Sequence, residues 1–160
     1  MSATGLEVFD RTLQTTNTWL GEIMQALDVE RHVAWKVLGV VLHTLRDRLP
    51  VELAAHLGSQ LPLLVRGVFY DQYQPARQPA DWRTLEAFVA EVGERLSDTR
   101  PVDPRRTVQA VFTVLSHHVP EGQIDKVRGA LPSPLRSFWE GIEEAESRSA
   151  EGGAETAAEI

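Results

Sequence analysis

The sequence contains no cysteine, so disulfide bonds, thiolate metal sites and cysteine nucleophiles are excluded. It also lacks an apolar run long enough to span a bilayer. The longest segment free of formal charge, residues 107–120, is too short and includes two histidines. The first residues lack the basic segment and apolar run of a secretory signal. We therefore expect a soluble, cytoplasmic protein.

The common signatures of enzymes are also missing. There is no nucleophile elbow, no phosphate-binding loop, no dinucleotide-binding glycine motif and no zinc-binding HExxH. The carboxylates are scattered, and Glu86, Glu91 and Glu94 fit the solvated face of a helix. We expect no catalysis, metal or cofactor, and an enzyme with a site between two halves of the chain remains a minority alternative.

The acidic charge is confined to one end of the chain. The 160 residues are 42% hydrophobic, which suits one compact domain, and they carry a net charge of −7. Residues 140–160 contain seven acidic residues and one basic residue, so residues 1–139 carry only −1. This distribution disfavours nucleic acid or an anionic membrane as the main partner. Because apolar residues become sparse there, we predict that residues 143–160 form a disordered acidic tail.

The remaining sequence has the periodicity of helices. Apolar residues recur at i, i+4 and i+8, first at Trp19, Ile23 and Leu27 and again at Phe88, Val92 and Leu96. Prolines at positions 50, 62, 120 and 132 each precede an apolar helical pattern, and proline is well tolerated at a helix start. Asp28 and Asp103 are predicted as N-caps. Strand patterns are nearly absent, so the expected fold is all-α with about eight short helices.

The two halves of the chain share one pattern. Residues 37–70 align with residues 107–140 without a gap, and six positions are identical. The identical pairs are Val41/Val111, Leu45/Leu115, Pro50/Pro120, Leu61/Leu131, Pro62/Pro132 and Arg66/Arg136. We interpret this as an internal duplication. The predicted organisation is a four-helix half at 6–73, a linker at 74–81 and a second half at 82–142, packed together as one domain.

Two segments resemble a known family. The run LRDRLPVELAAHLGSQLPLLVRGVFYDQY at residues 45–73 resembles the signature of a bacterial family of domains of unknown function, numbered 2267. The run VLSHHVPEGQIDKVRGALPSPLRSFWE at residues 114–140 resembles a weaker repeat of that pattern. The most specific part is the pair of helix–proline–helix turns at Pro50 and Pro62. The resemblance, which covers residues 9–139, implies an all-helical tandem-repeat fold and no particular activity.

Three groups of residues are candidates for interaction. Arg66 and Arg136 occupy equivalent positions, where they could form ion pairs, cap helix carbonyls or bind an acidic partner. An aromatic cluster brackets the linker and either fastens it or forms an exposed interaction patch. A basic stretch in the second half could bind phosphate or an acidic partner. The aromatic cluster comprises Phe69, Tyr70, Tyr73 and Trp82, and the basic stretch includes Arg105, Arg106 and Lys126.

The histidines give a weaker indication. His43 and Asp47 are spaced i, i+4 and could face one ligand, although a position at the edge of the core explains His43 equally well. The sequence therefore favours a non-catalytic helical module that binds another protein or binds itself as a homodimer. The alternative is a regulatory module that binds nucleic acid or a small anionic ligand through its basic second half.

Overall fold

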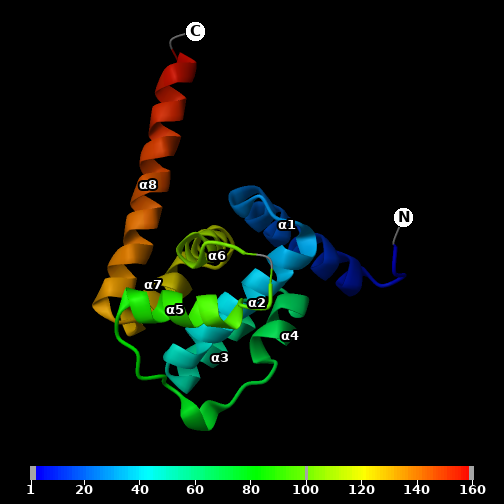
Figure 1. Cartoon of the computed structure of the whole chain (residues 1–160). Helices are drawn as coiled ribbons and strands as arrows, with labels where there is room; N and C mark the ends of the chain where they lie inside the picture. Colours follow the sequence, from blue (N-terminus) through cyan, green and yellow to red (C-terminus); the bar gives the residue numbers. More distant parts are fainter. Residues whose placement is uncertain (1–2, 100, 159–160) are drawn as a thin grey trace.

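The computed structural model describes residues 3–99 and 101–158, with side chains up to residue 153. This part of the chain forms eight α-helices and no strand, which confirms the all-α prediction (Figure 1). The helices are α1 (Glu7–Leu27), α2 (Arg31–Arg48), α3 (Val51–Ser59), α4 (Leu63–Tyr70), α5 (Leu85–Arg95), α6 (Pro104–His118), α7 (Glu121–Ala130) and α8 (Ser133–Ala158), with a short 3-10 turn, η1 (Pro75–Arg77). None of these described helices has the length and apolarity needed to cross a membrane.

Proline and aspartate set several helix boundaries. Helices α3, α4 and α7 begin directly after a proline that acts as N-cap, and α8 begins directly after Pro132. Asp103 accepts hydrogen bonds from the backbone N–H groups of Arg105 and Arg106, so its predicted role as N-cap is confirmed. The prediction for Asp28 is wrong. It adopts a left-handed conformation with φ of 51° and ends α1 instead.

The core is built around α2 and α6. These two helices pack against each other, and between them they contact α1, α4, α5, α7 and α8. Leu42 of α2 and Phe112 of α6 are fully buried. The Phe112 ring stacks on Trp139 with 4.0 Å between the ring centroids. Burial of large apolar side chains on both helices supplies most of the favourable free energy of folding.

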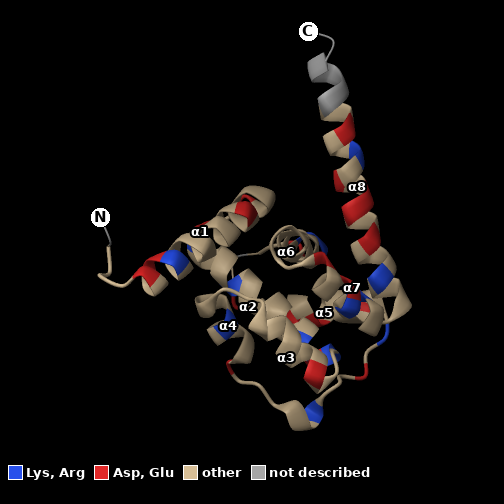
Figure 2. Ribbon diagram, turned by 180° about the vertical axis from the view of Figure 1, so that it is seen from behind, with Lys and Arg blue, Asp and Glu red and all other residues tan. Residues whose placement is uncertain are grey.

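The same boundaries recur 70 residues apart. Helices α2 and α6 end at residues 48 and 118, α3 and α7 begin at 51 and 121, and α4 and α8 begin at 63 and 133. Helix α1 packs against α6, and α5 packs against α2. The first helices differ in length, since α1 has 21 residues and α5 has 11. Figures 1 and 2 show that the N-terminal end of α1 extends beyond the neighbouring helices.

The acidic tail differs from its prediction. Residues 143–158, which are predicted to be disordered, form the second part of α8 and rise away from the body (Figure 1). Acidic positions recur along this part of the ribbon (Figure 2). Residues 159–160 lie outside the described chain. Two factors account for the helix: alanine and glutamate have high helix propensity, and the packed start of α8 supplies the nucleus that an isolated helix lacks.

The last contacts of α8 with the body lie near its middle. Glu143 accepts hydrogen bonds from Ser116 and Arg128, and Glu146 lies 3.1 Å from Nε2 of His117. Residues 147–153 are exposed, and the hydrogen bonds of their side chains stay within α8.

Deleting residues 147–160 should therefore leave the melting temperature nearly unchanged. Truncation from Ile142 should lower it, because Ile142 is buried and both glutamate contacts are lost. Thermal denaturation followed by circular dichroism compares the two truncations. A large drop after the shorter deletion would contradict the account, because it would show that the end of α8 docks on the body.

Candidate functional site

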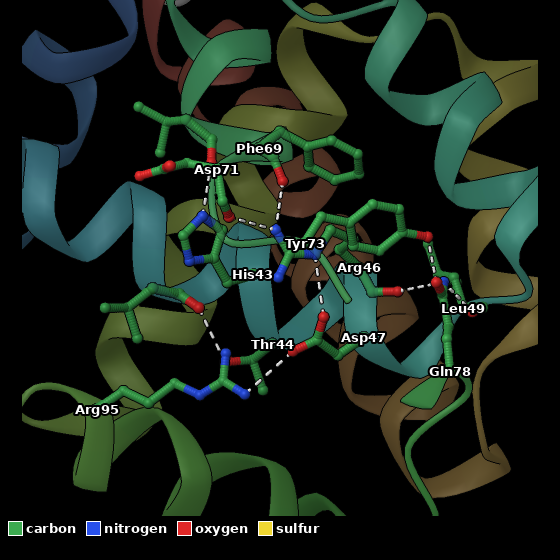
Figure 3. Close-up of polar contacts among 12 residues, drawn as sticks. His43, Thr44, Arg46, Asp47, Leu49, Phe69, Asp71, Tyr73, Gln78 and Arg95 are labelled. Atoms are coloured by element: carbon green, nitrogen blue, oxygen red, sulfur yellow. Dashed lines mark hydrogen bonds and ion pairs between the residues drawn. The ribbon is translucent and has the colours of Figure 1, made fainter. Parts of the chain in front are cut away.

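The connection between the two halves is fastened by Arg46 (Figure 3). This side chain is 3% exposed, and its Nη1 donates to the carbonyls of Phe69 at 2.6 Å and Asp71 at 3.0 Å. Its Nε donates to Oδ1 of Asp47 at 3.0 Å, and its guanidinium lies 4.7 Å from the ring centre of Tyr73. One buried cation thus holds the end of α4 and the start of the connection against α2.

Tyr73 and Gln78 secure the middle of the connection. The Tyr73 hydroxyl donates to Oε1 of Gln78, while Nε2 of Gln78 donates to the carbonyls of Arg46 and Leu49 at the end of α2. Burial raises the pKa of Tyr73, so the hydroxyl keeps its proton. The Arg46 carbonyl, which also accepts from the backbone N–H of Leu49, and the carbonyl of Leu49 at the C-cap of α2 are thus both bonded to the connection.

Trp82 secures the far end of the connection. Nε of Arg48 donates to the carbonyl of Trp82 at 3.0 Å, and the guanidinium lies 5.7 Å from the centre of its ring. The backbone N–H of Ala80 donates to the carbonyl of Asp47 at 2.6 Å. Tyr73 and Trp82 therefore fasten the linker, which is one of the two roles considered from the sequence.

A polar hollow of about 650 Å³ lies between α2, α5 and this connection. Asp47 connects its walls, since it pairs with Arg46 and accepts from Nη2 of Arg95 at 3.1 Å. Nε of Arg95 pairs in turn with Glu91 at 2.9 Å. His43 also lines the hollow, so the i, i+4 pair His43 and Asp47 does face one space.

His43 has a defined protonation state. Its Nε2 lies 2.6 Å from the carbonyl of Val68, which can only accept, so Nε2 carries the proton and Nδ1 is an acceptor. Burial lowers the pKa of His43, and the positive charges of Arg46 and Arg95 lower it further. The bond to Val68 and the charge of Asp47 raise the pKa and offset part of this shift.

This shift predicts a pH dependence of stability. The pKa of His43 is about 6.5 when unfolded and lower when folded, so the unfolded chain binds the proton more readily. The contribution to stability is present above about pH 6.5 and is lost as the pH falls below that value. Urea unfolding at several pH values should show that the free energy of unfolding of His43→Gln falls less than that of the parent as the pH is lowered. Equal losses in both proteins would contradict the assignment.

The carboxylates that line the hollow are paired with arginine side chains. Asp47 and Glu91 are each matched by an arginine, so neither is a free general acid or base. In the described part of the chain, no group of three or more His, Cys, Asp or Glu side chains is placed to hold a metal ion. The pair between Asp47 and Arg95 holds α2 and α5 together across the hollow.

Arg66 and Arg136 make the same contacts in the two halves. Arg66 donates from Nε to the Gly58 carbonyl at 3.0 Å and from Nη2 to the carbonyls of Ser59 and Leu61, both at 3.1 Å. Arg136 donates to the carbonyls found 70 residues later, at 3.2, 3.1 and 3.1 Å. Of the roles considered from the sequence, the structure shows the capping of helix carbonyls.

Arg105 and Arg106 of the second half are exposed, and each contacts another part of the chain. Nη2 of Arg106 donates to the carbonyl of Ala26 at 3.1 Å, against the end of α1. The Arg105 guanidinium lies 5.3 Å from the ring centre of Phe138. Both arginines are therefore engaged within the fold.

The structure divides the predicted aromatic cluster. Phe69 is fully buried in the core, whereas Tyr70 is exposed and donates its hydroxyl hydrogen bond to the carbonyl of Ala55 at 3.2 Å. The Tyr70 hydroxyl also lies against Gly58, where a side chain would collide with it. The Tyr70 ring lies 5.1 Å from the ring centre of Phe69 and 6.1 Å from that of Tyr73, so these three residues remain in contact. Trp82 instead packs on Phe88, with 4.8 Å between the ring centres.

A second feature is an exposed apolar surface on α1 and α4. In the described chain eight large hydrophobic side chains are exposed, and six of them, with 41% to 56% of their area accessible, lie on α1, at its N-cap or at the start of α4. We call this surface the α1–α4 face, and it comprises Leu6, Val8, Phe9, Leu13, Leu63 and Leu64. The backbone N–H of Leu64 lies 3.3 Å from Oγ1 of Thr12, which brings the two helices together. Clustered exposed apolar residues commonly mark interaction sites.

A groove of about 420 Å³ runs along this face between α1 and the α3–α4 corner. Val8 and Leu63 line it, together with Trp19. Trp19 is 1% exposed, and its indole N–H has no hydrogen-bond partner in the described structure. An unpaired buried donor costs about 1–3 kcal/mol, and native proteins contain few of them.

The sequence analysis missed this face. The relevant signal is surplus apolar character at the start of α4, where Leu63 and Leu64 precede the buried Val65 and Phe69. One apolar stripe is enough for the core contacts of α4, so Leu63 and Leu64 are hydrophobic residues beyond those that the core requires. Phe9 and Leu13 on α1 are spaced like core positions, so spacing alone did not separate them from the buried residues.

Comparison with known proteins gives one family. Residues 16–138 match the model of a family described as uncharacterized conserved proteins, DUF2267. The matched segment contains α2 to α7 and begins within α1, after Leu13. No curated protein matches the sequence.

Proposed function

This chain belongs to the DUF2267 family of uncharacterized conserved proteins. From the surface of the chain itself, we propose that it is a non-catalytic helical module that binds another protein through the α1–α4 face. The observation that carries this proposal is the gathering of six of the eight exposed large hydrophobic side chains of the described chain on that face. Burying such a surface against a partner would remove apolar area from water, at about 25 cal/mol per Å². We place this activity in the cytoplasm.

The polar features of the molecule support a non-catalytic role. In the hollow, the carboxylate of Asp47 forms ion pairs with both Arg46 and Arg95. Arg105 and Arg106, on which binding of nucleic acid or of a small anion would depend, are engaged with Phe138 and α1. The α1–α4 face, by contrast, has apolar side chains that keep 41% to 56% of their area exposed in the described chain.

We also propose that the two halves arose by duplication and pack with approximate two-fold symmetry. The three carbonyl contacts of Arg66 and of Arg136 recur at a shift of 70 residues, as do two helix starts and one helix end. The ends of the chain depart from this symmetry. Helix α1 is longer than α5, and α8 continues beyond the position equivalent to the end of α4.

Two matched variants test the proposed function. Leu63 and Val51 are each the first residue of a helix that follows a proline, and they are 48% and 47% exposed. Leu63 lies on the α1–α4 face, whereas Val51 does not. An acidic residue suits the first turn of either helix, so Leu63→Glu and Val51→Glu should both keep the parent's stability.

Affinity capture from host lysate, quantified by mass spectrometry, should recover a specific protein with the parent and with Val51→Glu. We expect Leu63→Glu to lose at least about 1.4 kcal/mol of binding, a tenfold loss of affinity. Recovery of the same proteins by all three baits would contradict the proposal. Native mass spectrometry of the same samples reports whether the bound protein is a second copy.

A further inference from the structure

Resting on the proposed function, we propose that the occupant of the α1–α4 groove is an acidic segment of another protein, anchored by a large apolar side chain. Three features of the groove support this chemistry: its apolar walls, the sign of its charged residues and an unpaired buried donor. Each corresponds to one group on the occupant.

The apolar walls of the groove favour an occupant that inserts an apolar side chain. Val8 and Leu63 face the groove from opposite helices, and both are about half exposed. The groove's volume of about 420 Å³ falls within the range of pockets that enclose ligand groups, about 300–1,000 Å³. A large side chain inserted between α1 and α4 would cover both walls.

The charged residues of the groove favour a negative occupant. Arg11 and Arg66 line it together with His118, and no carboxylate does so. Arg66 uses Nε and Nη2 to cap carbonyls, which leaves Nη1 without a contact in the described structure. Arg11 contacts Glu7, but both side chains are largely exposed, so this pair is easily exchanged for a carboxylate of a ligand. His118 contacts Glu22 at 2.8 Å, which lies outside the groove lining.

The unpaired indole N–H of Trp19 favours an occupant that carries a hydrogen-bond acceptor. Trp19 forms part of the groove wall, its ring stacks on His118, and its indole N–H is buried without a partner in the described chain. The contrast with Trp139 is informative, because the indole N–H of Trp139 donates to Ser116 at 2.8 Å. Because this nitrogen is buried, a carbonyl or carboxylate oxygen on the occupant would accept from it once the side chains over it move apart.

A random peptide library displayed on phage, selected on the immobilised full chain, tests this inference. We expect the selected peptides to combine a large apolar residue with Asp or Glu. Synthetic copies should bind the parent and Val51→Glu equally, bind Leu63→Glu and Arg11→Glu at least about tenfold more weakly, and weaken with salt. In ¹H–¹⁵N spectra the indole resonance of Trp19 should move on binding while that of Trp139 stays in place. This readout avoids substituting a buried tryptophan.

The possible failures are distinguishable. Selected peptides without acidic residues, or binding unaffected by Arg11→Glu, would overturn the acidic occupant. If Leu63→Glu still lost a captured protein, the proposed function would stand. A dimer that Leu63→Glu dissociates would identify a second copy as the occupant and also overturn the inference. If Leu63→Glu changes neither capture nor peptide binding, both proposals fail.

Discussion

Replacing Phe112 with aspartate should unfold the protein. The ring is fully buried in α6 and stacks on Trp139, with Phe88 and Phe138 nearby. Deleting a buried phenylalanine costs about 3–5 kcal/mol, and an unpaired buried carboxylate adds to this. The sum is comparable to the whole stability of a typical domain, about 5–15 kcal/mol. Leu42→Asp at the corresponding position of α2 should have the same effect.

The matched control is Phe9→Asp. Phe9 is 47% exposed on α1, so the same substitution should leave the fold intact. Circular dichroism and thermal melting compare the variants. A cooperative melt of Phe112→Asp near the temperature of the parent would contradict the core assigned to α2 and α6.

Replacing Arg46 with alanine should give the second largest effect. The substitution removes hydrogen bonds to Phe69, Asp71 and Asp47, and it leaves buried oxygens without a donor. The expected loss is about 3 kcal/mol in the free energy of unfolding. The 71–84 connection should also become more accessible to protease, because Arg46 holds its start.

The control for this prediction is Arg83→Ala. Arg83 is an exposed arginine in the same connection, and its removal should change the unfolding free energy by less than about 0.5 kcal/mol. Urea unfolding and limited proteolysis together measure both variants. If Arg46→Ala were as stable and as resistant to protease as Arg83→Ala, the role given to Arg46 would be wrong.

The all-α fold could be predicted because its signals are local. Prolines at 50, 62 and 120 lie directly before helix starts, and Asp103 caps α6 as expected. Asp28 shows the limit of such signals. An aspartate between two helices suits an N-cap or a left-handed C-cap, and the packing of α1 against its neighbours decides between them.

The sites were harder to predict because they depend on contacts between distant residues. The sequence indicates only that Arg46 is a cation in the last turn of a helix, yet the carbonyls to which it donates lie 23 and 25 residues away. Leu63 lies two residues before the buried Val65, which places the two side chains on opposite sides of α4 and leaves Leu63 exposed. The equivalence of Arg66 and Arg136 could be predicted because each follows a leucine–proline pair, and both donate to carbonyls only five to eight residues away.

The central claim is that the α1–α4 face binds a protein, and site-specific photocrosslinking in living cells tests it most directly. A photoreactive phenylalanine analogue placed at residue 63 probes the face, and the same group at residue 51 is the control, because both positions are about half exposed at a helix start. We predict a discrete crosslinked species from position 63 and none from position 51. Equal crosslinking from both positions, or none from position 63, would contradict the claim.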